Sequence, residues 1–108
     1  MLVTKDERKN GLIFRCEGRL DATTSIQLEN ALNKEIEQKH TKILVDFSGV
    51  EYLSSAGMRV LLSMTKRLKG MDGCFKLFAI HDDVMEIVRL AGFESILQIY
   101  ANESAALM

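Results

Sequence analysis

The chain has 108 residues, of which 47% are hydrophobic and 27% are charged, a composition typical of an ordinary globular domain. We expect residues 1–108 to form a single domain. The 14 Lys and Arg against 15 Asp and Glu give a formal net charge of -1, so we expect no nucleic-acid partner, because neutralising phosphates requires a cationic excess. No apolar run approaches the roughly 20 residues that span a membrane, and we expect no membrane partner.

The N-terminal segment becomes charged at Lys5 and has no stretch resembling a signal peptide, so we expect a cytoplasmic protein. Cys16 and Cys74 lie in apolar, strand-like segments outside any C-x-x-C pair, which favours two buried free thiols. With only His40 and His81 besides, the chain has almost no ligand set for a structural zinc ion. It also lacks phosphate-binding loops and hydrolase motifs, and we expect no cofactor.

The first third of the chain predicts a hairpin followed by a helix. Residues 1–7 and 12–17 are strand-like segments on either side of the turn dipeptide Asn10-Gly11, and Gly18 is expected to end the second one. A helical pattern opens at Asp21, has possible N-caps at 22–25, and runs to about Lys39, with apolar residues recurring every three or four positions.

The middle third predicts a buried strand and a second helix. Residues 43–47 are apolar through Val45, as in a central strand covered on both faces. We expect Ser48-Gly49 to break this strand and 50–53 to form a connection. The next helix is expected to start at Ser54 or Ser55 and to end near Lys69.

The last third predicts a strand over 74–80, a helix capped by Asp82 or Asp83 with Gly92 as its C-cap, a strand over 96–100 and a final helical turn within 102–108. Strands alternating with helices indicate an α/β fold. We predict a mixed, mostly parallel sheet of about five strands with an N-terminal hairpin, packed by three to four helices. Ligands and partners of such sheets meet the carboxyl ends of the strands, here 18–21, 47–55 and 80–82.

The most informative stretch is DFSGVEYLSSAGMRVLL, residues 46–62. Ser54 and Ser55 stand where a helix begins, and Gly57 follows in the first turn, where glycine is a poor helix former. Gly57 would leave the start of the helix open to another backbone. Ser54 is interpreted as the N-cap, with Ser55 either a plain helical residue or one that points to solvent. A phosphate on Ser55 would suit the positive end of the helix dipole and would repel a docked partner.

The chain resembles a STAS domain of the bacterial anti-sigma factor antagonist type. The segment GRLDATT is similar to the family's G-x-L-D-x-x-T element, DFSGVEYLSSAGMRVLL to its most characteristic stretch, and DDVMEIVRLAGFESILQIY to its third helix and last strand. The resemblance covers essentially the whole chain and implies the STAS fold. It puts the family's phosphorylated serine on Ser55, its common Asp on Ser54 and its common Ser or Thr on Ala56. The family's acidic residue near the phosphosite falls on Asp21.

The resemblance implies partner switching. The unphosphorylated protein would bind an anti-sigma factor that is also a serine kinase of the histidine-kinase-like ATPase class, and so release a sigma factor for transcription. The kinase would phosphorylate Ser55 and free itself, and a PP2C-type phosphatase would restore the active form. The protein is then a monomeric binding module with no catalytic or metal-binding residue. We expect its partner surface to comprise Asp21, Thr23, Ser54, Ser55, Gly57, Met58 and Arg59, although Met58 at helical spacing is more typical of a core residue.

Two other interpretations stay open. A STAS adaptor subunit of another complex, such as a lipid transporter, would use the same surface with Ser55 unphosphorylated. A small enzyme would need a concave polar pocket with a perturbed titratable group. A Ser55–His81 pair is geometrically conceivable for such an enzyme, because His81 follows a strand end.

Overall fold

The computed structural model describes residues 1–108. After an initial hairpin, helices and strands alternate along the chain. The elements are β1 (Leu2–Arg8), β2 (Gly11–Leu20), α1 (Ala22–Glu37), β3 (Lys42–Leu53), α2 (Ser55–Lys69), β4 (Cys74–Phe78), α3 (Asp82–Leu90), β5 (Gln98–Tyr100) and α4 (Glu103–Leu107).

The five strands form one sheet in the order β1-β2-β3-β4-β5. β1 pairs antiparallel with β2, and every other pair is parallel. The predicted α/β fold with a mixed, mostly parallel sheet is therefore confirmed. β3 lies at the centre of the sheet, as its two-sided apolar run predicted.

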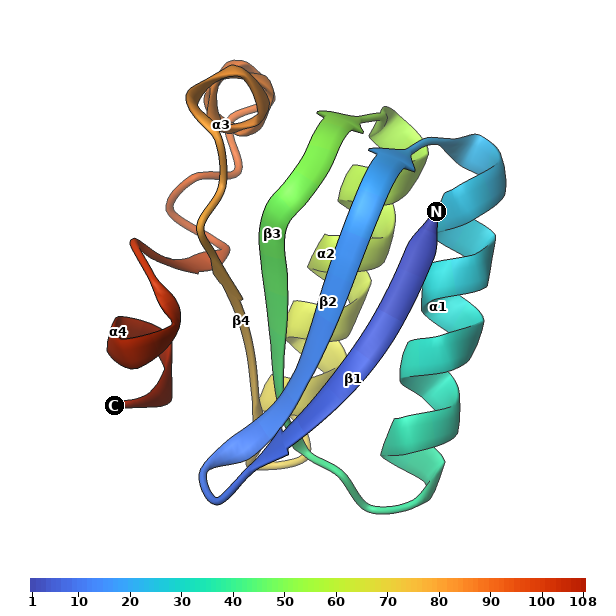
Figure 1. The fold of residues 1–108 in the computed structure, drawn as a ribbon, viewed down its shortest axis with the longest axis vertical. Coiled ribbons are helices and arrows are strands. Elements are labelled where there is room, and N and C mark those ends of the chain that lie inside the picture. Colours follow the sequence, from blue (N-terminus) through green and yellow to red (C-terminus); the bar gives the residue numbers. More distant parts are fainter.

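The two faces of the sheet carry different layers. α1 and α2 cover one face (Figure 1), and the main core lies between them and inward-facing residues such as Phe14 and Val45. Side chains alternate between the faces of a strand, so Ile13 and Leu44 point the other way. There they pack with Phe78 and with Ala106 of α4 in a second, smaller cluster.

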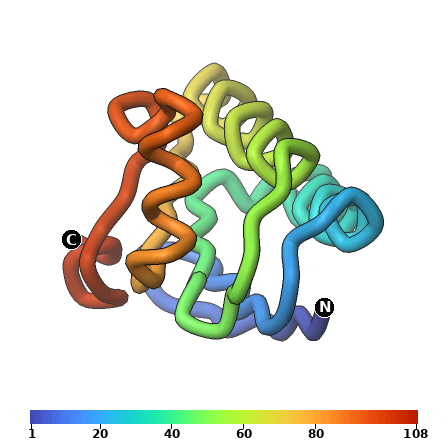
Figure 2. Tube along the Cα trace, turned by 90° about the horizontal axis from the view of Figure 1, so that it is seen from above, coloured from blue at the N-terminus to red at the C-terminus, as the bar shows by residue number.

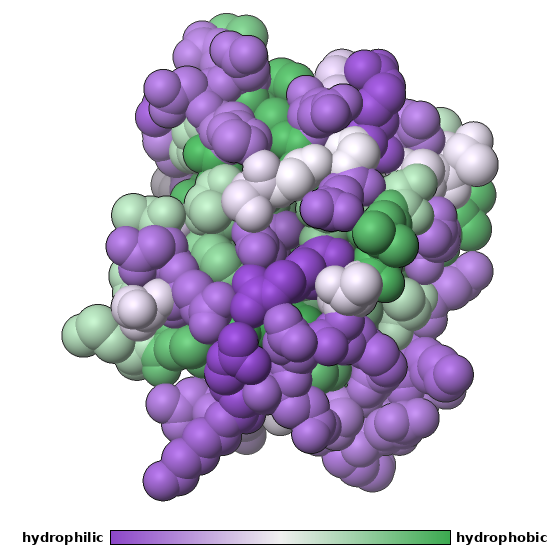
Figure 3. Space-filling view, in the orientation of Figure 1, coloured by the Kyte–Doolittle hydropathy of each residue, from purple (hydrophilic) through white to green (hydrophobic).

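Beside that smaller cluster, ion pairs centred on Arg15 occupy the same face of the sheet. The Arg15 guanidinium contacts Asp6 at 2.6 Å, Asp46 at 2.9 Å and Glu103 of α4 at 2.9 Å. Figure 3 views this side of the molecule and shows hydrophilic residues across much of it. The network ties the C-terminal helix to β1, β2 and β3.

The expected breaks at Gly18 and at Ser48-Gly49 are wrong, because β2 continues to Leu20 and β3 to Leu53. Both strands stay paired through irregular register, with Glu17 opposite Gly49 and Leu20 opposite Leu53. A Cβ on Gly49 would lie 2.9 Å from the Cys16 carbonyl oxygen, and Gly18 has a φ of +113°. The glycines therefore accommodate bulges within continuous strands.

The remaining boundaries differ by a few residues. β4 ends at Phe78 rather than at 80, because Ala79 turns the chain with a φ of +59°. His81 takes the N-cap position of α3, but its side chain makes no capping hydrogen bond, and the expected caps Asp82 and Asp83 lie in the first turn. α1 ends at Glu37, Ala91 rather than the expected Gly92 is the C-cap of α3, and β5 is limited to 98–100.

Both cysteines are free thiols, as expected, but only one of them is fully buried. Cys16 is 2% exposed and packs in the main core, whereas Cys74 is half-buried at the start of β4. Burial raises the pKa of the Cys16 thiol to about 12. Cys16 therefore behaves as a small hydrophobic residue rather than a reactive one.

Candidate functional site

Two helix starts lie side by side at the carboxyl edge of the sheet. Leu20 and Leu53 end β2 and β3 as a directly paired couple, so the next residues, Asp21 and Ser54, are brought to the same edge. The backbone N–H of Ser54 donates to the Leu20 carbonyl at 2.9 Å and joins the two chain segments. Figure 2 looks down on this edge, where β2 leads into α1 and β3 into α2.

Asp21 is the N-cap of α1, one position before the residues proposed for that role from the sequence. Its carboxylate accepts the backbone N–H groups of Thr23 at 3.0 Å and Thr24 at 2.9 Å, and the Thr24 hydroxyl completes a capping box. These hydrogen bonds, led by the one from Thr24, hold the pKa of Asp21 below its ordinary value. Asp21 thus carries a fixed negative charge beside the second helix start.

Ser54 and Ser55 play different structural roles. The Ser54 hydroxyl accepts the backbone N–H of Gly57 at 3.1 Å and caps α2. Ser55 is the first helical residue, its side chain is exposed, and its hydroxyl makes no hydrogen bond within the protein. The cap therefore occupies one serine and leaves the other hydroxyl open to solvent.

Gly57 is buried and faces the protein interior, contrary to the expectation that it exposes the helix start to a partner. A Cβ built on it would lie 2.8 Å from Leu20 Cγ and 2.9 Å from Leu53 Cδ1. Glycine lets the first turn of α2 approach the ends of β2 and β3. Its role is packing within the chain, and it offers a partner no side chain.

An apolar groove begins at the two serines and runs between α2 and α3. Its volume is about 280 Å³. Met58 is only 5% exposed and forms part of its floor, whereas Arg59 is exposed at its side. The groove is lined by Ser54, Ser55, Met58, Arg59, Leu62, Ile87, Ala91 and Phe93.

Comparison with known proteins assigns nearly the whole chain, including the candidate site, to one family. The STAS domain family model matches residues 3–106. The chain belongs to the STAS domain family. Two relatives of this STAS domain are BtrV of Bordetella bronchiseptica, named as an anti-sigma factor antagonist, and RsfB of Mycobacterium tuberculosis, named as an anti-sigma-F factor antagonist. BtrV is 29% identical over 98% of this chain and 91% of its own length. RsfB is 27% identical over 81% of this chain and 88% of its own length.

Solved structures agree on the fold of this STAS domain. The crystal structure of an anti-sigma factor antagonist from Thermotoga maritima has a TM-score of 0.91 at 20% identity, covering 97% of this chain and 91% of that one. The phosphorylated form of the Bacillus protein SpoIIAA has a TM-score of 0.73 at 18% identity, covering 96% of both chains. At these identities the likeness concerns the fold.

Most of the residues predicted for the partner surface lie at this edge of the STAS domain. Asp21 and Thr23 start α1, and Ser54, Ser55 and Arg59 start α2. Sequence reasoning missed Thr24 as the capping-box partner and the part of the groove contributed by α3 and the segment after it. The apolar stripe of α3 was visible in the sequence, but its position opposite α2 follows only from the fold.

His81 does not approach Ser55. Its Nε2 atom lies 2.5 Å from the Ser48 carbonyl oxygen, so the ring is engaged with the backbone of β3. The Ser55–His81 pair that an enzyme would need is not formed. No three His, Cys, Asp or Glu side chains gather in a way that could hold a metal ion, and no helix has the length and apolar character needed to cross a membrane.

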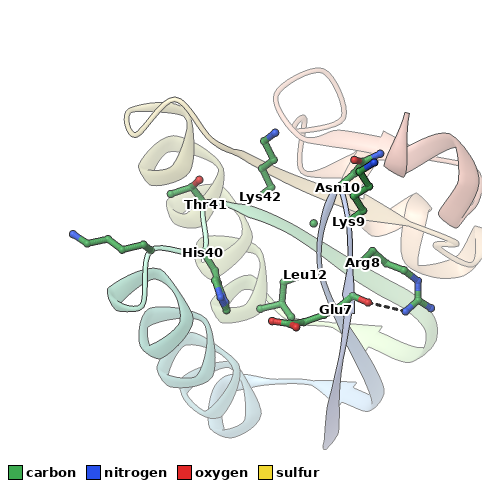
Figure 4. A pocket seen from close by; sticks show the side chains of 10 residues that line it. Glu7, Arg8, Lys9, Asn10, Leu12, His40, Thr41 and Lys42 are labelled. Atoms are coloured by element: carbon green, nitrogen blue, oxygen red, sulfur yellow. Dashed lines mark hydrogen bonds between the residues drawn. The ribbon is translucent and has the colours of Figure 1, made fainter.

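A second hollow, of about 250 Å³, lies between the β1–β2 turn and the loop after α1, and its lining is rich in cations. Figure 4 shows that Arg8 and Lys42 point in different directions rather than toward a common point. Arg8 is also engaged with the Glu7 carbonyl at 3.1 Å and with Glu103 at 3.4 Å. The cations of this hollow do not form a convergent anion site.

Proposed function

We propose that this STAS domain is an anti-sigma factor antagonist whose binding surface is switched by phosphorylation of Ser55. In its unphosphorylated form it binds an anti-sigma factor that is also a serine kinase of the histidine-kinase-like ATPase class. A PP2C-type phosphatase reverses the modification. The protein acts in the cytoplasm as a monomer, as ligand and substrate of its partners rather than as a catalyst.

The observation that carries the proposal is that Ser54 and Ser55 have different structural roles. Ser54 caps α2, so the Ser55 hydroxyl has no structural task and is exposed on the rim of an apolar groove. An apolar groove beside a modifiable hydroxyl suits a docking surface that a phosphate can block. The names of BtrV and RsfB support the same role.

The chemistry of the switch is a phosphoryl transfer to Ser55. The γ-phosphoryl group of ATP passes to Ser55 Oγ, the bond to the β-phosphate oxygen breaks, ADP leaves, and the hydroxyl proton is released. The product carries about -1.5 to -2 charges at neutral pH. This charge lies at the first turn of α2, where the helix dipole tolerates it. A partner surface packed over the groove would have to desolvate it, and binding would weaken while the domain stays folded.

The first test is phosphosite mapping by mass spectrometry on the protein isolated from growing and from stressed cells. We expect phosphate on Ser55, with an occupancy that differs between the two states. Peptide fragmentation must distinguish Ser55 from Ser54, which serves as the internal control because its hydroxyl is committed to the cap. An abundant protein with Ser55 unmodified in every condition would contradict the switch and favour a constitutive adaptor.

A second test measures binding directly. The kinase-type anti-sigma factor that co-purifies with the wild-type protein would be titrated calorimetrically with wild type, Ser55→Ala and Ser55→Asp. We expect Ser55→Ala to bind like wild type and Ser55→Asp to bind at least tenfold more weakly, about 1.4 kcal/mol. Equal affinity of all three would place the interface elsewhere.

A further inference from the structure

Five of the six arginines of the chain make a polar or stacking contact with another side chain, and one does not. Arg8 and Arg15 pair with Glu103, Arg67 donates to Asn33, Arg89 contacts Glu86 and Glu94, and Arg19 stacks 4.3 Å above the Tyr52 ring. Arg59 alone has neither an ion pair, nor a hydrogen bond, nor an aromatic ring. Such a guanidinium is free to receive an anion.

The position of Arg59 in the groove indicates which anion its guanidinium would bind. Ser55 and Arg59 line the same groove, and they are separated by one turn of α2. Residues four apart lie on the same helix face, with about 5–6 Å between their Cβ atoms. Arg59 is the only charged residue among those that line the groove, and no carboxylate there competes for it.

We infer that Arg59 is the intramolecular receptor of the phosphoryl group on Ser55, an inference that rests on the proposed function. The planar guanidinium fork matches two phosphoryl oxygens at once. The order of charges, with the anion four residues before the cation, is the favourable one on a helix. Arg59 therefore pairs with the phosphate along the α2 wall of the groove.

This pair changes what phosphorylation does to the docking surface. The phosphate adds negative charge, and by pairing with Arg59 it also neutralises the only cation of the groove. The paired groups lie on the rim over Met58 and Leu62, so a partner would meet a hydrated ion pair where the unmodified protein offers apolar surface. A carboxylate at position 55 is smaller and less charged, and it reproduces only part of this effect.

The test uses full-length protein in which phosphoserine is installed at position 55 during translation by an orthogonal tRNA pair, so that no kinase is needed. The phosphate is titrated between about pH 4.5 and 8 by phosphorus NMR, because its second pKa lies near 6. Wild type, Arg59→Gln and Arg67→Gln are compared. Arg67 is the matched control, because it is exposed on the same helix but lies about 18 Å along the helix axis from Ser55.

We expect the phosphate of the Arg59→Gln protein to titrate about 0.2–0.4 pH unit higher than that of wild type, because the guanidinium favours the dianion. Arg67→Gln should leave the titration unchanged. Identical titrations of wild type and Arg59→Gln would overturn the inference, as would an equal shift in Arg67→Gln, which would indicate a general charge effect. Since the phosphate is installed without a kinase, a failure here leaves the proposed function standing. Equally, absence of Ser55 phosphate in cells would leave this result intact.

Discussion

Replacing Gly57 by alanine tests whether the start of α2 is packed as tightly as its geometry indicates. The added Cβ would lie 2.8 Å from Leu20 Cγ and 2.9 Å from Leu53 Cδ1, closer than unbonded carbons approach. Leu20 and Leu53 are 0% and 1% exposed, so neither side chain has free space into which it can turn. The helix start or the strand ends must shift.

The magnitude follows from two opposing effects. Overpacking a well-filled core costs typically about 1–3 kcal/mol, whereas alanine is favoured over glycine in a helix by at most about 1 kcal/mol. The propensity gain is smaller in the first turn, where the helix is not yet fully hydrogen-bonded. We therefore expect Gly57→Ala to lower the free energy of unfolding by about 1–2 kcal/mol.

Urea unfolding followed by circular dichroism measures this difference. Gly70→Ala is the matched control, because Gly70 ends the same helix with a φ of -69° and a Cβ there would meet nothing closer than 3.5 Å. It should leave stability unchanged or raise it. If Gly57→Ala proved as stable as wild type, the close approach of α2 to the two leucines would not constrain the fold. Gly57 would then have to be explained by a partner.

Three further predictions concern the serines, the carboxylates and the buried thiol. Ser54→Ala should cost about 1 kcal/mol through the lost cap, with Ser55→Ala within about 0.5 kcal/mol of wild type in the same urea assay; equal losses would refute the division of roles. The hydrogen bond from Lys5 holds the pKa of Glu35 below its ordinary value. Burial raises the pKa of Asp46, but hydrogen bonds from Ser48 and Arg15 outweigh it and lower that pKa as well. In acid the unfolded chain therefore binds more protons than the folded protein. The stability contributed by the Glu35 and Asp46 carboxylates should be complete above about pH 5 and decline as the pH falls toward 3. A free energy of unfolding by urea that stays constant over this pH range would contradict the prediction. Cys16, with its raised pKa and its 2% exposure, should react with a thiol reagent at pH 8 only after unfolding. Peptide mapping distinguishes it from the half-buried Cys74, and rapid labelling of Cys16 itself in the native protein would show that the core opens.

Sequence reasoning succeeded where the signal was local. The two-sided apolar run identified the central strand, and the pair Ser54-Ser55 located the start of α2 to within a residue. It failed where a long-range contact decided the outcome. Gly49 looked like a strand breaker, but it lies opposite Glu17 and lets the Cys16 carbonyl approach. Nothing near it in the sequence contains that information.

The same distinction applies to the candidate site. Helix caps are local patterns, so the two helix starts could be found from the sequence, although the cap of α1 fell one residue earlier than its proposed positions. The apolar groove needs α3, some 30 residues farther along the chain, to lie against α2. The packing role of Gly57 likewise depends on the leucines that end β2 and β3. The apolar pattern of a helix indicates that one face is buried, but it does not indicate which other element packs against that face.

The pairing of β2 with β3 explains why a modification of Ser55 would leave the fold undisturbed. Because Leu20 and Leu53 are paired, Asp21 and Ser54 lie at the same edge of the sheet. The side chain of Asp21 caps α1, and that of Ser54 caps α2. The side-chain hydrogen bonds that cap the two helix starts therefore come from Asp21, Thr24 and Ser54. Ser55 contributes none of these bonds, so a change at its hydroxyl alters the rim of the groove while the caps stay intact. A residue placed first in a helix whose cap is already satisfied is structurally expendable, and that is the property a reversible switch requires.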